Sequence, residues 1–291
     1  MRREALFALP IIAAIGGALA WAGSQGGIRT GGVPVFALGV ALAFVINALA
    51  FVPSWLARSE RFYDLTGSAT YLSVAGLALA LGPADGRARL LAAMIGVWAL
   101  RLGIFLFARI HASGRDPRFD AIKLDFARFL MAFMLQGLWV ALTAGAALAA
   151  MTAAPGAPAL GVSDAIGFLV WLAGFGLEVV ADRQKQVFRA DPAHADRFIA
   201  TGLWARSRHP NYLGEIVLWL GVAWVAFPAL AGFNLATLVS PLFVYVLLTR
   251  ISGIPLLEAR ARRRWGADPA YLAYLEETPR LFPRLSSGRP S

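Results

Sequence analysis

The sequence predicts an all-α membrane protein, a polytopic bundle of about seven or eight transmembrane helices. Hydrophobic residues make up 58% of the 291-residue chain and charged residues only 15%, whereas about a quarter of a soluble domain is charged. Several apolar runs reach the roughly 20 residues that a helix needs to cross a bilayer. Because the chain has no cysteine, disulfides and thiolate catalysis are excluded.

Eight apolar runs divide the chain into spans joined by short loops. The first follows Met1-Arg-Arg-Glu and lacks a good cleavage site, so we expect a retained helix rather than a signal peptide. The sixth should continue as a polar helix through Arg189, and the eighth should break near Pro241 and Pro255. The runs cover residues 5–21, 33–55, 65–81, 90–110, 126–151, 162–181, 215–227 and 234–251.

The basic residues lie almost entirely on one side of this predicted topology. If both termini share a side, all 27 Lys and Arg fall on that side except Arg29, Arg87, Arg89 and Arg101. The positive-inside rule then places both termini in the cytoplasm. Topology therefore accounts for most of the net charge of +10. No basic segment forms a recognisable nucleic-acid reader, so we expect the lipid bilayer and no nucleic acid as a partner.

The stretch at 201–215, TGLWARSRHPNYLGE, crowds polar groups at the start of an apolar helix. Such groups are costly in this position unless they bind something. Its three cationic side chains suit a diphosphate or a carboxylate, and its asparagine can make a bidentate contact to an adenine or a carboxamide. A basic cytoplasmic loop would explain the cations, but not the polar residues that follow them. The set comprises Arg206, Arg208, His209, Asn211, Tyr212 and Glu215.

The end of the sixth span adds an acidic face. Glu178 and Asp182 are four residues apart and share one side of the helix. Carboxylates accept hydrogen bonds from ribose hydroxyls, and Arg189 with Arg197 can hold phosphates. The alternative is an interfacial helix end with snorkelling side chains. However, Glu178 lies a turn inside the apolar run, where a carboxylate without a partner is expensive.

Two further segments contribute polar residues. After the last span, Glu258 precedes Arg260 and three consecutive arginines, and Tyr274 shares a helical face with Tyr271. The alternative for this segment is a juxtamembrane polybasic helix that binds anionic lipid. Arg101 lies inside the fourth span, where an arginine marks a candidate functional site unless it forms a salt bridge to a carboxylate such as Glu178.

Familiar soluble nucleotide and metal motifs are missing from the sequence. The three histidines are scattered, and neither HExxH nor CxxC occurs, so we expect no metal site. Neither GxSxG, nor a Walker motif, nor GxGxxG after a strand is present, which excludes a soluble Rossmann domain as the nucleotide carrier.

Taken together, these motifs resemble the steroid 5-alpha-reductase superfamily and, more narrowly, its uncharacterised bacterial branch. The resemblance runs from about Phe51 to Pro283. Its elements are YDLTGS, WALRLGIFLFAR, RFD, the E-x-x-x-D of the sixth span, TGLWARSRHPNYLGE and the closing TPRLFP. RHPNYLGE is the most specific of these. RHP-x-Y-x-G alone is shared with isoprenylcysteine carboxyl methyltransferases and related membrane enzymes.

The resemblance implies a helical bundle in the bacterial inner membrane, with a cytoplasm-facing cavity that holds NADPH. It assigns residues 1–50 to N-terminal transmembrane helices, 51–283 to the reductase-like domain and 284–291 to a flexible tail. Glu178 stands where the steroid enzymes have an asparagine, and Tyr212 replaces a phenylalanine. Positions that match cofactor contacts of the family are Arg101, Asp182, Arg189, Arg197, Asn211 and Glu215.

The catalytic acid has to differ from that of the family. Trp98 stands at the position of the family's catalytic tyrosine and cannot donate a proton. We expect Tyr63 and Asp64 in YDLTGS to take this role near the membrane surface. The alternative for these two residues is a helix N-cap and an interface anchor.

The expected function is NADPH-dependent reduction of an activated C=C bond in an apolar, steroid-like or other lipid substrate. Two alternatives remain open: an S-adenosylmethionine-dependent membrane methyltransferase that uses the same RHPNYLGE stretch, and a non-catalytic lipid-binding membrane protein. A shift of thermal stability with one cofactor and not the others would separate them.

Overall fold

The fold is a polytopic helical membrane protein, as the sequence predicts. The computed structural model describes the backbone of residues 2–113, 116 and 118–283, and the side chains of 7–111, 116 and 118–283. The predicted tail at 284–291 lies outside the described residues. Within them, seven helices are long and apolar enough to cross a membrane, and the apolar part of the first helix, Phe7–Gly23, is shorter.

The helices form two compact units. The first contains residues 1–167 and 222–240, and the second contains residues 168–221 and 241–291. Helices α7 (Val162–Ala190) and α8 (Pro210–Ala226) have residues in both units. The sixth span does continue as a polar helix through Arg189, as expected, and ends at Ala190.

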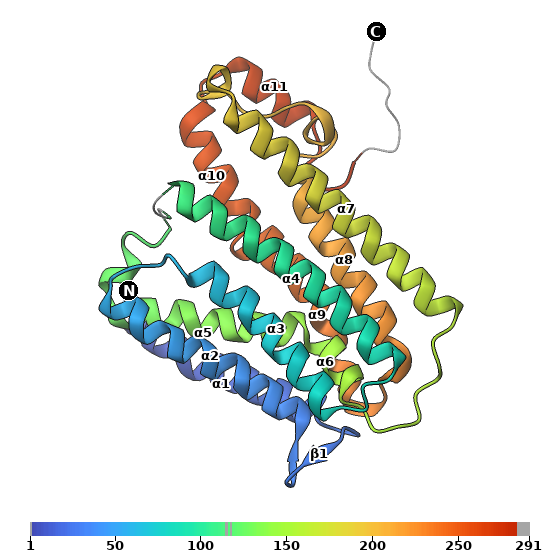
Figure 1. Cartoon of the computed structure of the whole chain (residues 1–291). Helices are drawn as coiled ribbons and strands as arrows, with labels where there is room; N and C mark the ends of the chain where they lie inside the picture. The colour runs from blue at the N-terminus through green and yellow to red at the C-terminus, as the bar shows by residue number, and fades with distance from the viewer. Residues whose placement is uncertain (1, 114–115, 117, 284–291) are drawn as a thin grey trace. The chain divides into compact units, whose positions relative to one another are not determined.

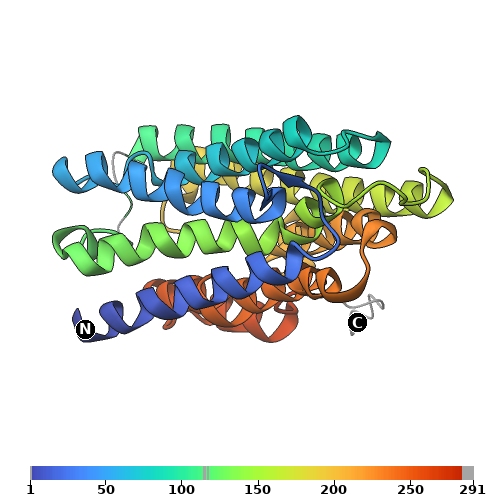
Figure 2. The ribbon, with the colours of Figure 1, turned by 90° about the horizontal axis from the view of Figure 1, so that it is seen from below.

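The first unit is a bundle in which α2 packs against α3 and α5, α3 packs against α4, and α1 packs along α5 (Figures 1 and 2). Four buried aromatic rings, Phe51, Phe119, Phe129 and Phe133, form a cluster in its core. A two-residue hairpin, β1 (Arg29–Thr30) and β2 (Val33–Pro34), joins the first two helices. The helices are α1 (Arg2–Gly23), α2 (Val35–Leu56), α3 (Tyr63–Leu81), α4 (Gly86–Ser113), α5 (Phe126–Thr143) and α6 (Gly145–Met151).

The fifth predicted span is wrong in one respect, because it is two helices rather than one. α5 ends at Thr143 and α6 begins at Gly145. At the junction the hydroxyl of Ser240 donates a hydrogen bond to the Thr143 carbonyl. A side chain that inserts into the helical hydrogen-bond ladder breaks it, and glycine has low helix propensity.

The eighth predicted span breaks near Pro255, as predicted, but the break predicted near Pro241 is wrong. Pro241 lies in the first turn of α9 (Val239–Val246), where proline is tolerated. A 3₁₀ segment (Gly232–Leu238) precedes α9 and a π turn (Leu247–Ile251) follows it. The chain turns at Gly253, where a β-carbon would collide with the Leu248 carbonyl oxygen. Pro255 then starts α10 (Ile254–Trp265), and α11 (Pro269–Glu277) completes the second unit.

Candidate functional site

The polar residues of the second unit are brought together where α7 and α8 cross. Glycines make this crossing possible. A β-carbon on Gly214 would lie 2.6 Å from the backbone nitrogen of Glu178 and 2.7 Å from the carbonyl oxygen of Gly174. One on Gly174 would collide with the backbone nitrogen of Leu218. The backbones of the two helices therefore touch directly, and neither position has room for a side chain.

The close crossing places the acidic face of α7 beside the start of α8. Glu178 and Asp182 are 3% and 8% exposed and lie one turn apart. Asn211, in the first turn of α8, donates a hydrogen bond from Nδ2 to Asp182 Oδ1 at 3.2 Å. Two residues that the sequence predicts for one site are thus in contact. Glu215 lies one turn further along α8 and is partly buried.

The loop before α8 is anchored by aromatic residues. Trp204 is 3% exposed, and its indole N–H donates to the Ala181 carbonyl at 3.0 Å. The Lys185 ammonium lies 4.4 Å from the centre of its ring. The hydroxyl of Tyr274 donates to the Trp204 carbonyl at 2.8 Å, and burial raises the pKa of Tyr274. Tyr274 therefore positions the loop that carries the predicted site.

Glu258 is the centre of a cationic cluster in the second unit. Its carboxylate lies 3.0 Å from Arg208 Nη1, 3.5 Å from His209 Nε2 and 3.4 Å from Arg280 Nη2. The 3.5 Å separation from His209 exceeds a good hydrogen bond. Among the described residues, buried Arg208 Nε, His209 Nε2 and Glu258 Oε1 have no hydrogen-bond partner. The cluster therefore has polar atoms left over for a polar ligand.

The His209 ring is held in a largely buried position. It is 7% exposed and stacks on the ring of Tyr212, with centroids 5.8 Å apart. Burial lowers the pKa of His209 below its usual value, and the nearby Glu258 carboxylate only partly offsets this effect. The cationic charges of Lys185 and Arg208 lower it further. His209 is thus held mainly as a neutral imidazole near neutral pH.

The C-terminal segment at 279–281 holds the loop before α8 in place through hydrogen bonds. The backbone N–H of Arg208 donates to the Pro279 carbonyl at 2.9 Å, and the Ser207 hydroxyl donates to the Leu281 carbonyl at 2.7 Å. Leu281 is buried against Leu213 and Ile254. The residue-level prediction did not include Ser207 or Arg280. The closing TPRLFP motif could have indicated them, because it contains Arg280 and the two residues whose carbonyls hold the loop, Pro279 and Leu281.

Two predicted phosphate ligands lie on the surface of the second unit. Arg189, in the last turn of α7, is exposed, and so is Arg197 in the loop that follows. The side chains of Arg208 and His209 lie in the Glu258 cluster, whereas those of Arg189 and Arg197 are exposed. Their part in ligand binding stays a prediction.

The first unit holds the remaining predicted residues. Tyr63 donates a hydrogen bond from its hydroxyl to the Ala132 carbonyl at 3.0 Å. Asp64 lies in the first turn of α3, since this helix begins at Tyr63, and it faces Arg109 at 3.6 Å and Arg118 at 3.9 Å. Asp64 is thus not the N-cap of α3, which is Phe62. Arg101 is partly buried in α4, with its guanidinium 5.2 Å from the Phe105 ring.

Glu60 is a second carboxylate of the first unit that binds neighbouring polar groups. Glu60 is 5% exposed and accepts hydrogen bonds from the backbone N–H of Asp116 and from Lys123 Nζ, both at 2.9 Å. Burial alone would raise the pKa of Glu60, but these hydrogen bonds outweigh it and lower the pKa. Asp116 in turn pairs with Arg118, the residue that faces Asp64. The sequence patterns did not predict this role for Glu60.

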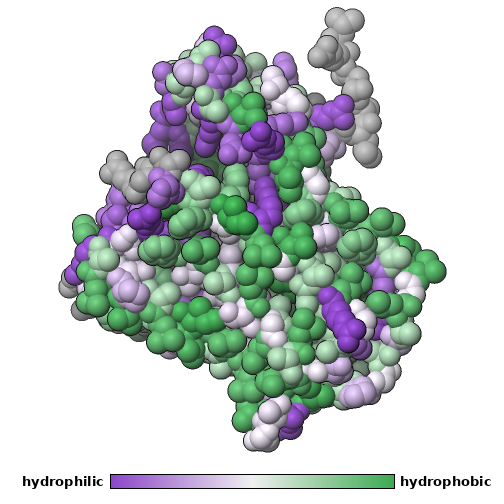
Figure 3. Space-filling model, in the orientation of Figure 1, coloured by the Kyte–Doolittle hydropathy of each residue, from purple (hydrophilic) through white to green (hydrophobic). Residues whose placement is uncertain are grey.

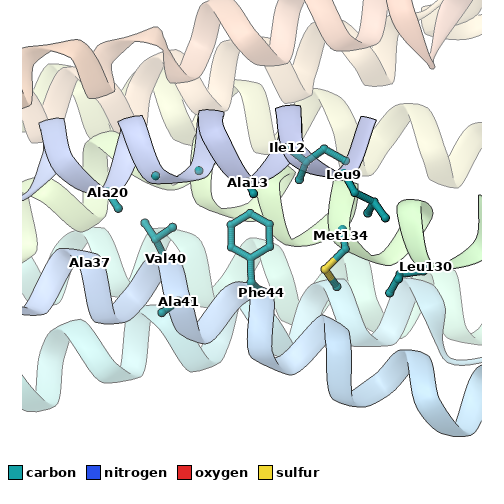
Figure 4. A pocket seen from close by; sticks show the side chains of 12 residues that line it. Leu9, Ile12, Ala13, Ala20, Ala37, Val40, Ala41, Phe44, Leu130 and Met134 are labelled. Carbon is teal, nitrogen blue, oxygen red and sulfur yellow. The ribbon is translucent and has the colours of Figure 1, made fainter. Parts of the chain in front are cut away.

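The first unit also contains an apolar groove of about 430 Å³ between α1, α2 and α5. Phe44 points from α2 toward α1 near Ala13, and Met134 closes the α5 side (Figure 4). All of its lining residues are apolar or glycine. The groove has no group for binding a nucleotide, so the polar cluster of the second unit is the candidate site.

The fold and the site define a helical membrane protein with a partly buried acid–amide pair and a cluster of cationic residues around Glu258 in its second unit. Among the described residues, no group of three or more His, Cys, Asp or Glu side chains is placed to hold a metal ion.

The chain belongs to the family described as Protein of unknown function (DUF1295), whose model matches residues 50–278. The matched region contains every predicted site residue.

The chain is also similar to an uncharacterized protein of Schizosaccharomyces pombe. The two are 24% identical over 283 residues, an alignment that covers 86% of this chain and 80% of the yeast protein. No solved structure is significantly similar to the chain.

Proposed function

We propose that the protein is a membrane-embedded, NADPH-dependent reductase of an activated C=C bond in an apolar substrate. The observation that carries this proposal is the arrangement around the start of α8. There the Asp182–Asn211 pair and the Glu258 cluster, in which Arg208 Nε and His209 Nε2 have no hydrogen-bond partner, belong to one compact unit.

The donor and acceptor set fits a dinucleotide. Buried carboxylates such as Glu178 and Asp182 accept hydrogen bonds from ribose hydroxyls, while the cations bind diphosphate oxygens. Asn211 offers both a donor and an acceptor to an amide or a base edge. The exposed arginines Arg189 and Arg197 favour the additional 2′-phosphate of NADPH over NADH.

When bound, a nicotinamide supplies a hydride to one carbon of the double bond. The protein then has to provide a proton, and Tyr63 and Asp64 are the proposed donors. The Tyr63 hydroxyl already donates a hydrogen bond to the Ala132 carbonyl, and Asp64 faces Arg109 and Arg118. We expect Asp64→Asn to abolish NADPH oxidation by an apolar enone while leaving NADPH binding unchanged. Full turnover by both Asp64→Asn and Tyr63→Phe would remove these residues from the mechanism.

Ligand-dependent thermal stability tests the function itself. A ligand that binds the folded state at 100 times its Kd stabilises it by about 2.7 kcal/mol. We expect NADPH to raise the Tm of the detergent-purified protein more than NADH, and S-adenosylmethionine to leave it unchanged. A shift with S-adenosylmethionine alone would instead support the methyltransferase, and no shift with any of the three would support a non-catalytic protein.

Specificity of the shift is checked with variants. Asn211→Ala should reduce the NADPH-dependent shift, because Asn211 is hydrogen-bonded to Asp182 in the proposed site. Arg183→Ala is the control, since Arg183 is an exposed residue of α7 whose side chain donates a hydrogen bond to Gln186. It should leave the shift unchanged.

We also propose that the protein lies in a bacterial inner membrane with both termini in the cytoplasm. The support is the distribution of Lys and Arg between alternate loops. Reporter fusions at the C-terminus test this orientation. A cytoplasmic fluorescent reporter should be active there, and activity of a periplasmic phosphatase at that position would contradict it.

A further inference from the structure

Helix α10 is the C-terminal part of Gly232–Trp265, the last stretch that is long and apolar enough to cross a membrane. The π turn at Leu247–Ile251 and the tight turn at Gly253 lead directly into it. Four of its twelve residues are arginine. An arginine at the centre of a transmembrane helix costs roughly 2.5–3.5 kcal/mol, so α10 does not continue the span. It therefore starts at the membrane boundary.

One face of α10 points away from the core of the second unit. Ile254 is fully buried, whereas Leu256 is 48% exposed, and Arg260 and Arg263 are exposed as well. These three exposed residues recur at the i, i+4 and i+7 spacing of one helical face. We call Leu256, Arg260 and Arg263 the α10 basic face. Figure 3 shows hydrophilic side chains gathered over the α10 and α11 part of the second unit.

The arginines of this face differ from their neighbours in having no acidic partner. Arg208 and Arg280 pair with Glu258, and Arg264 pairs with Asp196 at 2.8 Å. Over residues 118–283, by contrast, no carboxylate forms an ion pair with Arg260 or Arg263, nor with exposed Arg262 between them. Like charges three residues apart on a helix repel each other. An anion from outside the chain would relieve this repulsion.

We propose that the α10 basic face binds the phosphate groups of anionic phospholipids at the surface of the membrane. Arginine donates paired hydrogen bonds to phosphate oxygens. The exposed Leu256 beside the arginines favours a lipid over a free anion, since it can insert among the upper acyl carbons. The position of α10 directly after a span brings the face to the height of the headgroups.

The expected strength follows from the number of charges. Each arginine near an anionic surface raises affinity about fivefold, which corresponds to about 1 kcal/mol. Removing two of them should therefore weaken the preference for anionic lipid more than tenfold. The effect should also decrease with added salt, because such interactions are screened.

Lipid retention by the full-length protein tests the proposal. The protein is reconstituted in nanodiscs of equal parts phosphatidylcholine and phosphatidylglycerol, extracted in detergent, and its bound lipids are quantified by mass spectrometry. We expect the wild type to retain phosphatidylglycerol over phosphatidylcholine and Arg260→Gln/Arg263→Gln to lose this preference. Arg29→Gln/Arg89→Gln removes the same charge from two other exposed arginines and should retain it.

Two measurements keep the result interpretable. The Tm of each variant in phosphatidylcholine alone confirms that it folds, and Arg260→Lys/Arg263→Lys should preserve most of the lipid preference if charge is responsible. Equal loss in the Arg29/Arg89 control, or unchanged retention in a folded Arg260/Arg263 variant, would overturn the proposal. Displacement of the lipid by inorganic phosphate at matched ionic strength would show a free-anion site instead. Because no cofactor is present, the outcome does not depend on the proposed reductase activity.

Discussion

Arg87 and Asp164 form a buried, bidentate ion pair in the first unit. Arg87 Nη2 lies 3.0 and 3.1 Å from the two carboxylate oxygens, and both side chains are at most 6% exposed. Arg87 also donates to the carbonyls of Pro158 and Val225, and the Gly161 N–H donates to the carboxylate. One charge pair therefore fastens the start of α4 to the start of α7 and the end of α8.

Breaking this pair from one side should strongly destabilise the protein. Removing one partner of a buried ion pair leaves an uncompensated charge and costs about 3–5 kcal/mol. We expect this loss for Arg87→Met, measured as free energy of unfolding in detergent. Arg89→Met, two residues further along α4 at an exposed position, is the control and should cost little. Similar values for the two variants would contradict a stabilising role for the pair.

The close crossing of α7 and α8 leads to a second prediction, which concerns Gly214. A β-carbon at Gly214 meets the α7 backbone at 2.6 Å, so Gly214→Ala has to push the helices apart. Overpacking of this kind costs roughly 1–3 kcal/mol, and the shift would also separate Asn211 from Asp182. Gly176→Ala on α7 is the matched control, because a β-carbon at that position would have no neighbouring atom within 4 Å. The Tm should fall for the first variant only; an equal Tm for both would refute a backbone contact.

Much of the fold was predictable because bilayer thickness imposes long apolar runs. The start and end of α3, α4 and α7 lie within a few residues of the predicted limits. The break at Ala144 was not predictable, because it depends on Ser240, which is distant in sequence. The break predicted near Pro255 is confirmed by the turn at Gly253, whereas the break predicted near Pro241 is wrong. Proline usually breaks a helix, so the sequence predicts a break at Pro241. However, proline is tolerated in the first turn of a helix, and Pro241 lies in the first turn of α9.

The candidate site was predicted as a set of residues but not as a set of contacts. Helical spacing places Glu178 and Asp182 on one face, but it does not say that Asn211 will face them. That contact depends on the crossing at Gly214. Arg87 and Asp164 illustrate the same limit, since each looks like an ordinary loop charge until tertiary packing buries both.

The state of His209 makes stability depend on pH. Its pKa is lowered in the folded protein, so the unfolded chain binds its proton first as the pH falls. The resulting loss of folding stability is absent above the unfolded pKa of about 6.5, and it grows as the pH decreases below that value. We expect the wild-type Tm to fall between about pH 7.5 and about pH 5.5. His209→Gln should flatten this decline.

The Glu60 carboxylate acts in a lower pH range than His209. The pKa of Glu60 is lowered from an ordinary value of 4.5, so its contribution is present above that value and is lost only at lower pH. The facing groups Glu258, Lys185 and Arg208 stay unchanged in His209→Gln. A decline as steep in this variant as in the wild type would show that another group titrates.

The Asp182–Asn211 pair should determine nucleotide affinity rather than stability alone. Asn211→Ala removes an amide whose Nδ2 donates to Asp182, and Asp182→Asn keeps an acceptor at this position but removes the charge. If the carboxylate binds a ribose hydroxyl, both variants should weaken NADPH binding about tenfold, equivalent to about 1.4 kcal/mol. Titration calorimetry of the purified protein measures this directly, with Arg183→Ala as the control on the same helix. Wild-type affinity in both folded variants would place the nucleotide away from this pair and remove the main support for the proposed reductase.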